Sequence, residues 1–338
     1  MKNHILVLAL GSAMALSACG GGGGGGGGST TTPPVTTTPP ASTLTAINAT
    51  NATSAAANAY AATTSVGSSS TPLTGILTGV SVSNTNINTV APLLQLVKHA
   101  YGRQQLLTGV TVNETDPCTG GGNLVINGTV NNPDNVSNGD TLTITANSCV
   151  ENGQTLSGGF SVKFSGVSGN INTAVFGVTM DSTFNSFNIT SGTDKIGVNG
   201  DMKVVLNQTS ASASNIALSG NSLKTTEQQG SATAVERTVT AYTVTGSTVN
   251  GVNSSAANFG LSGTSPKLGT FSYTVQNKQP FVFSTSSAVV PSSGSLIVNG
   301  NASSVTATVV ATGVQVDLTA GGSTQSNTVA WDAFLSSM

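Results

Sequence analysis

The sequence predicts an all-β protein: a large curved antiparallel meander or a partly closed barrel, with a two-layer sandwich as the alternative and one N-terminal helix packed on the sheet. From Val110 onward, β-branched and aromatic residues alternate with polar ones, the period of a strand with one buried face. Asn-Gly, Ser-Gly and similar turn pairs recur at intervals of about ten residues. Because no helix of crossover length intervenes, successive strands are expected to be antiparallel neighbours.

The segments with the clearest alternation define the expected strands. They are NLVINGTV (123–130), DTLTITAN (140–147), GFSVKFSGV (159–167), AVFGVTMD (174–181), FNSFNIT (184–190), KIGVNGDMKVVLNQ (195–208), NIALSG (215–220), RTVTAYTVTG (237–246), GTFSYTVQN (269–277), PFVFSTS (280–286), SLIVNG (295–300), SVTATVVAT (304–312) and VQVDLTA (314–320). This pattern assigns residues 110–338 to a β-domain.

Residues 44–109 have a different composition and are expected to contain an alanine-rich segment and an amphipathic helix. The stretch AINATNATSAAANAYAATTS (46–65) is rich in alanine, but its many Asn and Thr residues make it a poor isolated helix, part linker and part marginal helix. APLLQLVKHAYGRQQLL (91–107) is a better candidate, because its leucines recur at helical spacing after Pro92. We expect this second segment to be the helix that covers the core of the sheet.

The first eighteen residues have the pattern of a secretion signal. Lys2 is followed by an apolar stretch that ends at Leu16, too short for a transmembrane helix, which needs about 20 residues. The next residues, Leu16-Ser17-Ala18-Cys19, resemble the lipobox of bacterial lipoproteins. An ordinary signal peptide that happens to precede a cysteine is the alternative.

The lipobox resemblance implies that residues 1–18 are removed and that the thiol of Cys19 carries a diacylglycerol. With further acylation of the new amino group, the chain would be held at a membrane without a transmembrane helix. Residue 20 is Gly rather than Asp, which resembles lipoproteins sorted to the outer membrane; which face of that membrane the protein occupies stays open. Residues 19–43, with nine glycines and a Thr/Pro-rich stretch, are expected to form a tether.

The charge of the chain excludes several classes of partner. Only 7% of residues are charged and the net charge is −2, so the protein has too little field to attract nucleic acid. Solubility must come from Ser, Thr, Asn and Gly. A protein, glycan or apolar ligand remains open as a partner, besides the membrane reached through Cys19.

Cys118 and Cys149 are the remaining cysteines once Cys19 is set aside. In an exported protein an even pair predicts a disulfide, whereas two buried free thiols or a metal pair are the alternatives. A zinc site needs further Cys or His ligands, and the mature chain would contain only His99. We therefore expect no metal and no cofactor.

A second, broader pattern resembles uncharacterised proteobacterial lipoproteins. It includes Cys118, Gly121-Gly122, Gly139-Asp140 and Cys149, followed by the tail segments VVPSSGSLIVNG, SVTATVV and VQVDLTA and a closing Trp331-Asp332. The turn before the tryptophan is often acidic in such proteins, whereas this chain has Ala320-Gly321-Gly322-Ser323. The resemblance implies location and fold and carries no activity with it.

Catalytic motifs are scarce in the sequence. No Gly-x-Ser-x-Gly elbow occurs, and His99 beside Lys98 is more typical of a solvated or capping histidine than of a general base. Paired carboxylates are the chemistry of glycosidases. The nearest pairs are Asp134 with Asp140, Glu114 with Asp116, and Asp181 with Asp201. We expect a non-enzymatic binding or structural module, with an envelope polysaccharide hydrolase using paired carboxylates as the alternative.

Overall fold

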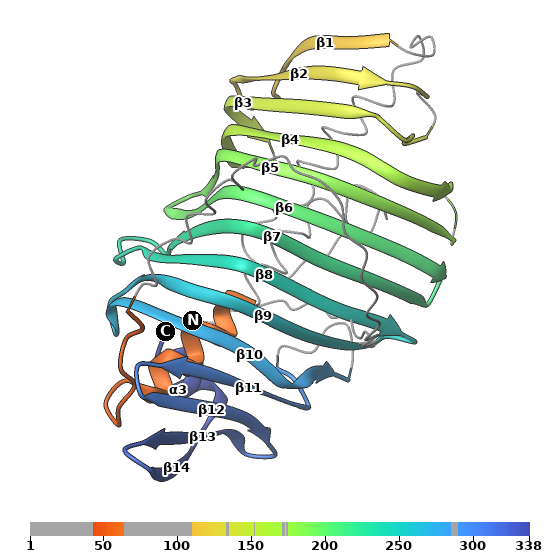
Figure 1. The fold of residues 1–338 in the computed structure, drawn as a ribbon. Coiled ribbons are helices and arrows are strands. Elements are labelled where there is room, and N and C mark those ends of the chain that lie inside the picture. Colours follow the sequence, from red (N-terminus) through yellow and green to blue (C-terminus); the bar gives the residue numbers. More distant parts are fainter. Residues whose placement is uncertain are drawn as a thin grey trace, which may run out of the picture.

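A computed structural model describes residues 43–63, 110–132, 135–151, 153–170, 173, 175–284 and 290–338. Fourteen strands form one sheet in which each strand pairs with the next along the chain, always antiparallel (Figure 1). The strands are β1 (Val110–Pro117), β2 (Asn123–Val130), β3 (Thr141–Glu151), β4 (Gln154–Gly169), β5 (Phe176–Ser191), β6 (Asp194–Ser210), β7 (Ala213–Gln228), β8 (Val235–Val249), β9 (Val252–Ser265), β10 (Gly269–Phe283), β11 (Ser293–Gly300), β12 (Ser303–Val310), β13 (Gly313–Ala320) and β14 (Ser323–Val329).

The predicted curved meander is confirmed. The sheet is not closed, since β1 and β14 lie at its two ends and do not pair with each other. All described strands belong to this one sheet, so the alternative of a two-layer sandwich is wrong.

One face of the sheet carries an almost continuous apolar surface, which we call the inner face. Its register is visible where Phe160 of β4 lies opposite Phe184 of β5, which in turn lies opposite Gly200 of β6. All ten phenylalanines of the chain are buried, none more than 4% exposed. Because side chains alternate between faces along a strand, the intervening polar residues form the outer face.

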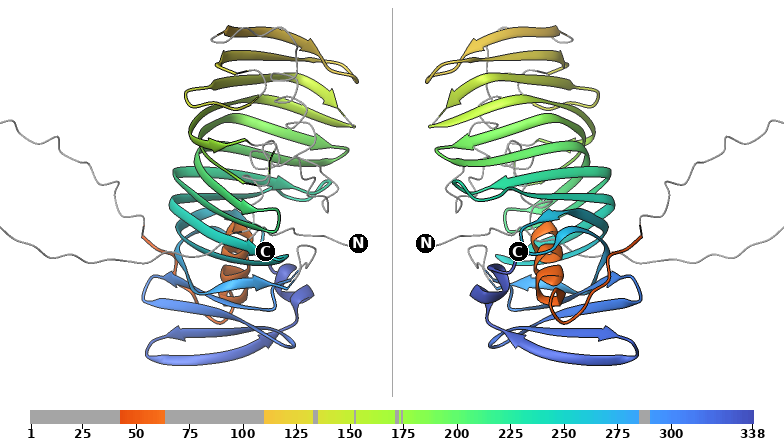
Figure 2. Two further views of the ribbon diagram at one scale, coloured as in Figure 1. Left: turned by 90° about the vertical axis from the view of Figure 1, so that its right-hand side faces the viewer. Right: turned by 90° about the vertical axis from the view of Figure 1, so that its left-hand side faces the viewer.

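A row of β-bulges bends the sheet. Register shifts follow one another from strand to strand, between Ala146 and Cys149 on β3 and between Phe184 and Phe187 on β5, and again on β6, β8 and β10. Two bulged residues, Ser186 and Ala241, have φ values of 47° and 45°. A bulge kinks its strand and increases the local twist, so a row of them curls the sheet around its inner face (Figure 2).

The helix on the sheet is formed by residues 52–63 and lies inside the curve (Figure 2). Asn48 caps it, because its Oδ1 accepts the Thr50 N–H at 2.9 Å while Asn51 Oδ1 accepts the Asn48 N–H at 2.8 Å. This reciprocal pair satisfies two N–H groups of the helix start. Its asparagines made this segment a marginal helix by composition. Two of them, Asn48 and Asn51, nevertheless form the cap at which the helix begins.

Most positions of this helix are buried alanines. Ala52, Ala55, Ala56, Ala57, Ala59, Ala61 and Ala62 are all buried. A helix that is apolar all round belongs in an interior, and small side chains allow it to approach the sheet closely. The predicted helix at 91–107 lies outside the described residues.

The described chain ends in a short helix, α3 (Trp331–Leu335), whose Phe334 is buried. Its rings meet the first helix, because the Tyr60 ring lies 5.6 Å from the Trp331 ring and 6.1 Å from the Phe334 ring. Within the described part of the chain, no helix has the length and apolar character needed to cross a membrane.

Candidate functional site

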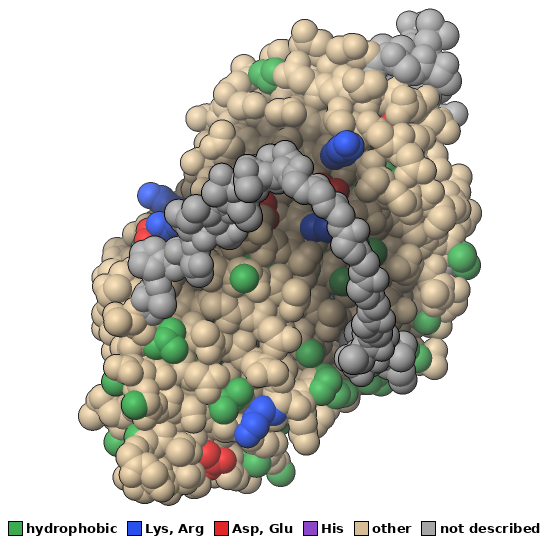
Figure 3. Space-filling model, viewed as in Figure 1, with side chains coloured by type: hydrophobic (Ala, Val, Ile, Leu, Met, Phe, Trp, Pro, Cys, Tyr) green, Lys and Arg blue, Asp and Glu red, His purple; other side chains and the backbone are tan. Residues whose placement is uncertain are grey.

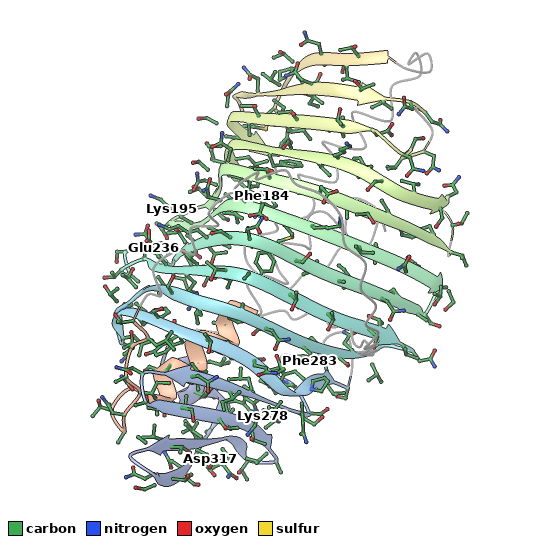
Figure 4. The ribbon with its side chains drawn as sticks, in the orientation of Figure 1. Phe184, Lys195, Glu236, Lys278, Phe283 and Asp317 are labelled. Carbon is green, nitrogen blue, oxygen red and sulfur yellow. A yellow bond between two sulfur atoms is a disulfide. The ribbon has the colours of Figure 1, made fainter. Side chains whose placement is uncertain are left out.

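The inner face of β4 and β5 carries an aromatic cluster of Phe160, Phe184 and Phe187. The ring centroids of Phe160 lie 6.2 Å from Phe184 and 5.8 Å from Phe187. Figure 4 shows Phe184 near the middle of the sheet. Because the described phenylalanines are buried here, none of them offers a solvent-facing platform on which a sugar ring could stack.

Arg237 of β8 is buried on the inner face and is 2% exposed. Among the residues that the structure describes, it is the one buried cation. Its Nη1 contacts Oε2 of Glu227 at 3.0 Å, and its Nε donates to Oδ1 of Asn58 at 3.2 Å. Its neighbours across the two adjacent strands are small, Thr225 on β7 and Gly263 on β9, which leaves room for the guanidinium. The group is paired and hydrogen-bonded, as a buried charge must be.

Sequence reasoning missed Arg237 as an interior residue. The signal was present, since Arg237 has the same parity as the apolar Val239 in the segment RTVTAYTVTG. An arginine in phase with buried positions indicates a buried partner on another element. That partner, Asn58, lies 179 residues away in the sequence.

A second polar contact on the inner face joins β6 to β8 across β7. The Tyr242 hydroxyl donates to the carbonyl oxygen of Asp201 at 2.6 Å. Gly220 of β7 lies between them, and a Cβ there would come within 2.5 Å of the Tyr242 hydroxyl oxygen. Burial, together with the negative charge of Asp201, raises the pKa of Tyr242.

Cys118 and Cys149 form the predicted disulfide, with Cα atoms 5.4 Å apart. The loop after β1 folds back on β3, where the Gly120 N–H donates to the Val150 carbonyl at 2.9 Å. Gly121 and Gly122, with φ values of 115° and 72°, allow this turn.

Glu151 lies beside the disulfide and binds Thr119. Its Oε1 accepts the Thr119 backbone N–H at 2.7 Å, and both carboxylate oxygens contact the Thr119 hydroxyl. The two cysteines and Glu151 are close enough to be considered as a metal cluster. However, sulfurs that are bonded to each other are not thiolate ligands.

Asp140 is fully buried and organises the turn between β2 and β3. Its Oδ1 accepts the Asn131 N–H at 2.9 Å, and its Oδ2 accepts the Ser137 N–H at 2.8 Å. The carboxylate therefore takes the place of backbone carbonyls as the acceptor for these two loop N–H groups, which is a structural role. The other member of this candidate pair, Asp134, lies outside the described residues.

Asp181 and Asp201 lie diagonally from each other on the outer face of β5 and β6, since Asp181 is opposite Lys203 and Asp201 is opposite Thr183, but their carboxylates have different partners. Asp181 of β5 forms an ion pair with Lys203 of β6 at 3.5 Å, and both side chains are half exposed. The Asp201 carboxylate accepts the backbone N–H groups of Asn221 and Ser222 on β7, at 2.8 and 3.0 Å. Each carboxylate is thus directed to a different neighbour.

Glu114 and Asp116 lie two residues apart on β1, the first strand of the sheet, opposite Ile126 and Leu124 of β2. Both therefore face the inner side, and Asp116 is buried. These two carboxylates occupy adjacent positions on one face of a single strand. Cys19 and His99 lie outside the described residues.

The charged side chains on the face drawn in Figure 3 are few and scattered among uncharged polar groups. Lys224 and Glu236 form an exposed ion pair at 2.8 Å, and Figure 4 places Glu236 near one border of the sheet. No protein-family model, no curated protein and no solved structure matches this chain.

Proposed function

We propose that this chain is a lipid-anchored envelope protein of the outer membrane, and that its β-domain is a non-enzymatic binding or structural module. The lipobox-like Leu16-Ser17-Ala18-Cys19 and the glycine-rich stretch behind it supply the anchor and the tether. Two or three acyl chains hold a protein at a membrane almost permanently, whereas one holds it only marginally.

The observation that carries the non-enzymatic part is the use made of three of the candidate carboxylates. Asp140 is committed to a turn, Asp181 to an ion pair and Asp201 to backbone N–H groups of a bulge. A glycosidase needs two carboxyl groups facing one another across a substrate, about 5–10 Å apart. Carboxylates held by structural partners are consistent with a scaffold.

The point at which the tether would join the domain is fixed to the sheet. The Thr45 N–H donates to the Ser272 carbonyl of β10 at 2.8 Å, and the Ser272 N–H donates to Thr45 Oγ1 at 2.9 Å. The Thr45 carbonyl accepts the Asn301 N–H at 3.2 Å. A force applied through the tether would therefore act on β10 and on the turn between β11 and β12.

The anchor is tested by labelling cells of the native host with radioactive palmitate. The wild-type chain should incorporate label and fractionate with membranes, and Cys19→Ser should lose both properties. The matched control is the double variant Cys118→Ser/Cys149→Ser, which keeps Cys19 and should keep the label. Equal labelling of wild type and Cys19→Ser would overturn the anchor.

The non-enzymatic part is tested separately with isolated envelope polysaccharide as the substrate. We expect no release of reducing ends by the purified protein. Release that disappears in Asp181→Asn/Asp201→Asn or in Glu114→Gln/Asp116→Asn would overturn this part of the proposal and leave the anchor untouched.

A further inference from the structure

The two edges of the open sheet differ in how they are protected against strand pairing. On β1, Glu114 and Asp116 face the inner side, and Pro117, which has no N–H to donate, ends the strand. Inward-pointing charges and proline on an edge strand are the devices by which proteins block edge-to-edge association. The β1 edge is therefore poorly suited to receive another strand.

The β14 edge has none of these devices. Its sequence, STQSNTV, contains no charged residue and no proline, and all its residues but Val329 are exposed. Within the described part of the chain, β14 pairs with β13 alone. Figures 1 and 2 both show it as the last strand at its end of the sheet.

The hairpin turn fixes which groups of β14 point outward. Ala320 lies opposite Ser323, joined by Gly321 and Gly322 with φ values of 58° and 79°. In such a two-residue hairpin the closing pair is hydrogen-bonded, and hydrogen-bonded pairs then alternate along the ladder. Ser323, Gln325 and Asn327 consequently bond to β13. The N–H and C=O groups of Thr324, Ser326 and Thr328 point away from the sheet.

We propose that β14 is a homodimerisation edge, at which it pairs antiparallel with β14 of a second copy about a twofold axis through Ser326. The two outward residues on either side of Ser326 are both threonines, so the edge is its own complement: Ser326 meets Ser326, and Thr324 meets Thr328. The three pairs would exchange about six backbone hydrogen bonds. This inference does not rest on the lipid anchor.

The charges near this edge permit self-pairing. The nearest acid on the same face is Asp317 of β13, opposite Ser326, and it accepts from Gln315 Nε2 at 2.9 Å. Asp317 of one copy and Asp317 of the other would lie three strand spacings apart, about 14 Å. At physiological ionic strength that is beyond the Debye length of about 8 Å, so their repulsion is largely screened.

A single added strand pair makes a small interface, and small interfaces form weak, concentration-dependent complexes. The test therefore uses the full chain in intact cells, where its local concentration is preserved. Ser326→Cys places one thiol on the twofold axis, with Cα atoms about 5.5 Å apart across a hydrogen-bonded pair. A short bismaleimide should then link two copies into a species of twice the mass.

Thr115→Cys is the matched control, since Thr115 is an exposed position on β1, the opposite edge. It should stay monomeric under the same treatment. In purified protein, Ser326→Asp should raise the dissociation constant of the dimer about two- to fivefold, because like charges directly opposite each other destabilise a strand pair. Thr115→Asp should leave that constant unchanged.

Three results would overturn the proposal. They are the absence of a Ser326→Cys dimer, equal cross-linking through Thr115→Cys, and a Ser326→Cys adduct formed solely with a different protein. The last result would mean that a foreign strand occupies β14. Palmitate labelling of Cys19 has no bearing on any of them, so failure here is distinguishable from failure of the anchor.

Discussion

Asn58 and Arg237 join the buried helix to the beginning of β8 through a hydrogen bond of 3.2 Å between Oδ1 and Nε. The guanidinium is also held by Glu227, whose side chain is 38% exposed, whereas that of Arg237 is 2% exposed. The helix therefore does more than fill apolar space, because Asn58 accepts a hydrogen bond from the guanidinium that the sheet buries.

Replacing Asn58 should destabilise the protein more than replacing a residue of a surface ion pair. In Asn58→Ala the Arg237 Nε–H loses its partner in the interior, at a cost of about 2–3 kcal/mol in the free energy of unfolding. Urea denaturation followed by circular dichroism measures this difference.

The matched control is Lys224→Met, which breaks an ion pair whose side chains are 44% and 42% exposed. Exposed pairs contribute about 0–1 kcal/mol, so this variant should be nearly neutral. Equal losses of unfolding free energy in the two variants would mean that the hydrogen bond between Asn58 and Arg237 contributes no more to stability than an exposed ion pair.

Removal of the disulfide should have a larger effect. The bond closes a loop of 31 residues, which in the chain-entropy model stabilises the protein by roughly 3–4 kcal/mol. Cys118→Ser/Cys149→Ser should lower the free energy of unfolding by that amount, as measured by urea denaturation under non-reducing conditions. The control Thr119→Ala, which removes the side-chain contact to Glu151, should cost less than about 1 kcal/mol. A double variant as stable as wild type would contradict the prediction.

Strands with β-branched and aromatic residues at alternate positions are predictable from sequence, and β2, β12 and β13 illustrate this. Three strands, β1, β9 and β14, were not among the expected segments. β9, VNSSAANFGLSGTS, is built mostly from Ala, Ser, Asn and Gly, and β14, STQSNTV, has no apolar alternation. Their neighbours in the sheet determine these strands, because β propensity is largely a matter of packing against adjacent strands.

Bulges and the candidate site were harder to predict than strands. The segments 174–181 and 184–190 were expected to be two strands, yet both fall largely within β5, which continues through a bulge at Ser186 with φ of 47°. A serine in that conformation has no signature in composition. Likewise, neighbouring acids in the sequence do not reveal which partner each carboxylate meets, as Asp181 and Asp201 demonstrate.

Three buried tyrosines should make the protein sensitive to alkali. Burial raises the pKa of Tyr60, Tyr242 and Tyr273 in the folded state above the ordinary value of 10.0. Up to about pH 9 both states hold these protons and the free energy of unfolding is unaffected. At higher pH the unfolded chain loses them first, so stability should fall by up to about 1.4 kcal/mol per pH unit for each tyrosine, until the pKa of that tyrosine in the folded state is reached.

Phenylalanine variants separate this effect from the hydroxyl contacts. The Tyr60 hydroxyl has no hydrogen-bond partner among the described residues, whereas that of Tyr242 donates to Asp201 at 2.6 Å. At pH 7, Tyr60→Phe should therefore be neutral or stabilising by up to about 1 kcal/mol, and Tyr242→Phe should cost about 1 kcal/mol. Above pH 10 each variant should show a shallower loss of stability than wild type. Urea denaturation at pH 7, 10 and 11 tests both parts, and an unchanged alkaline slope in Tyr60→Phe would contradict the burial of that hydroxyl.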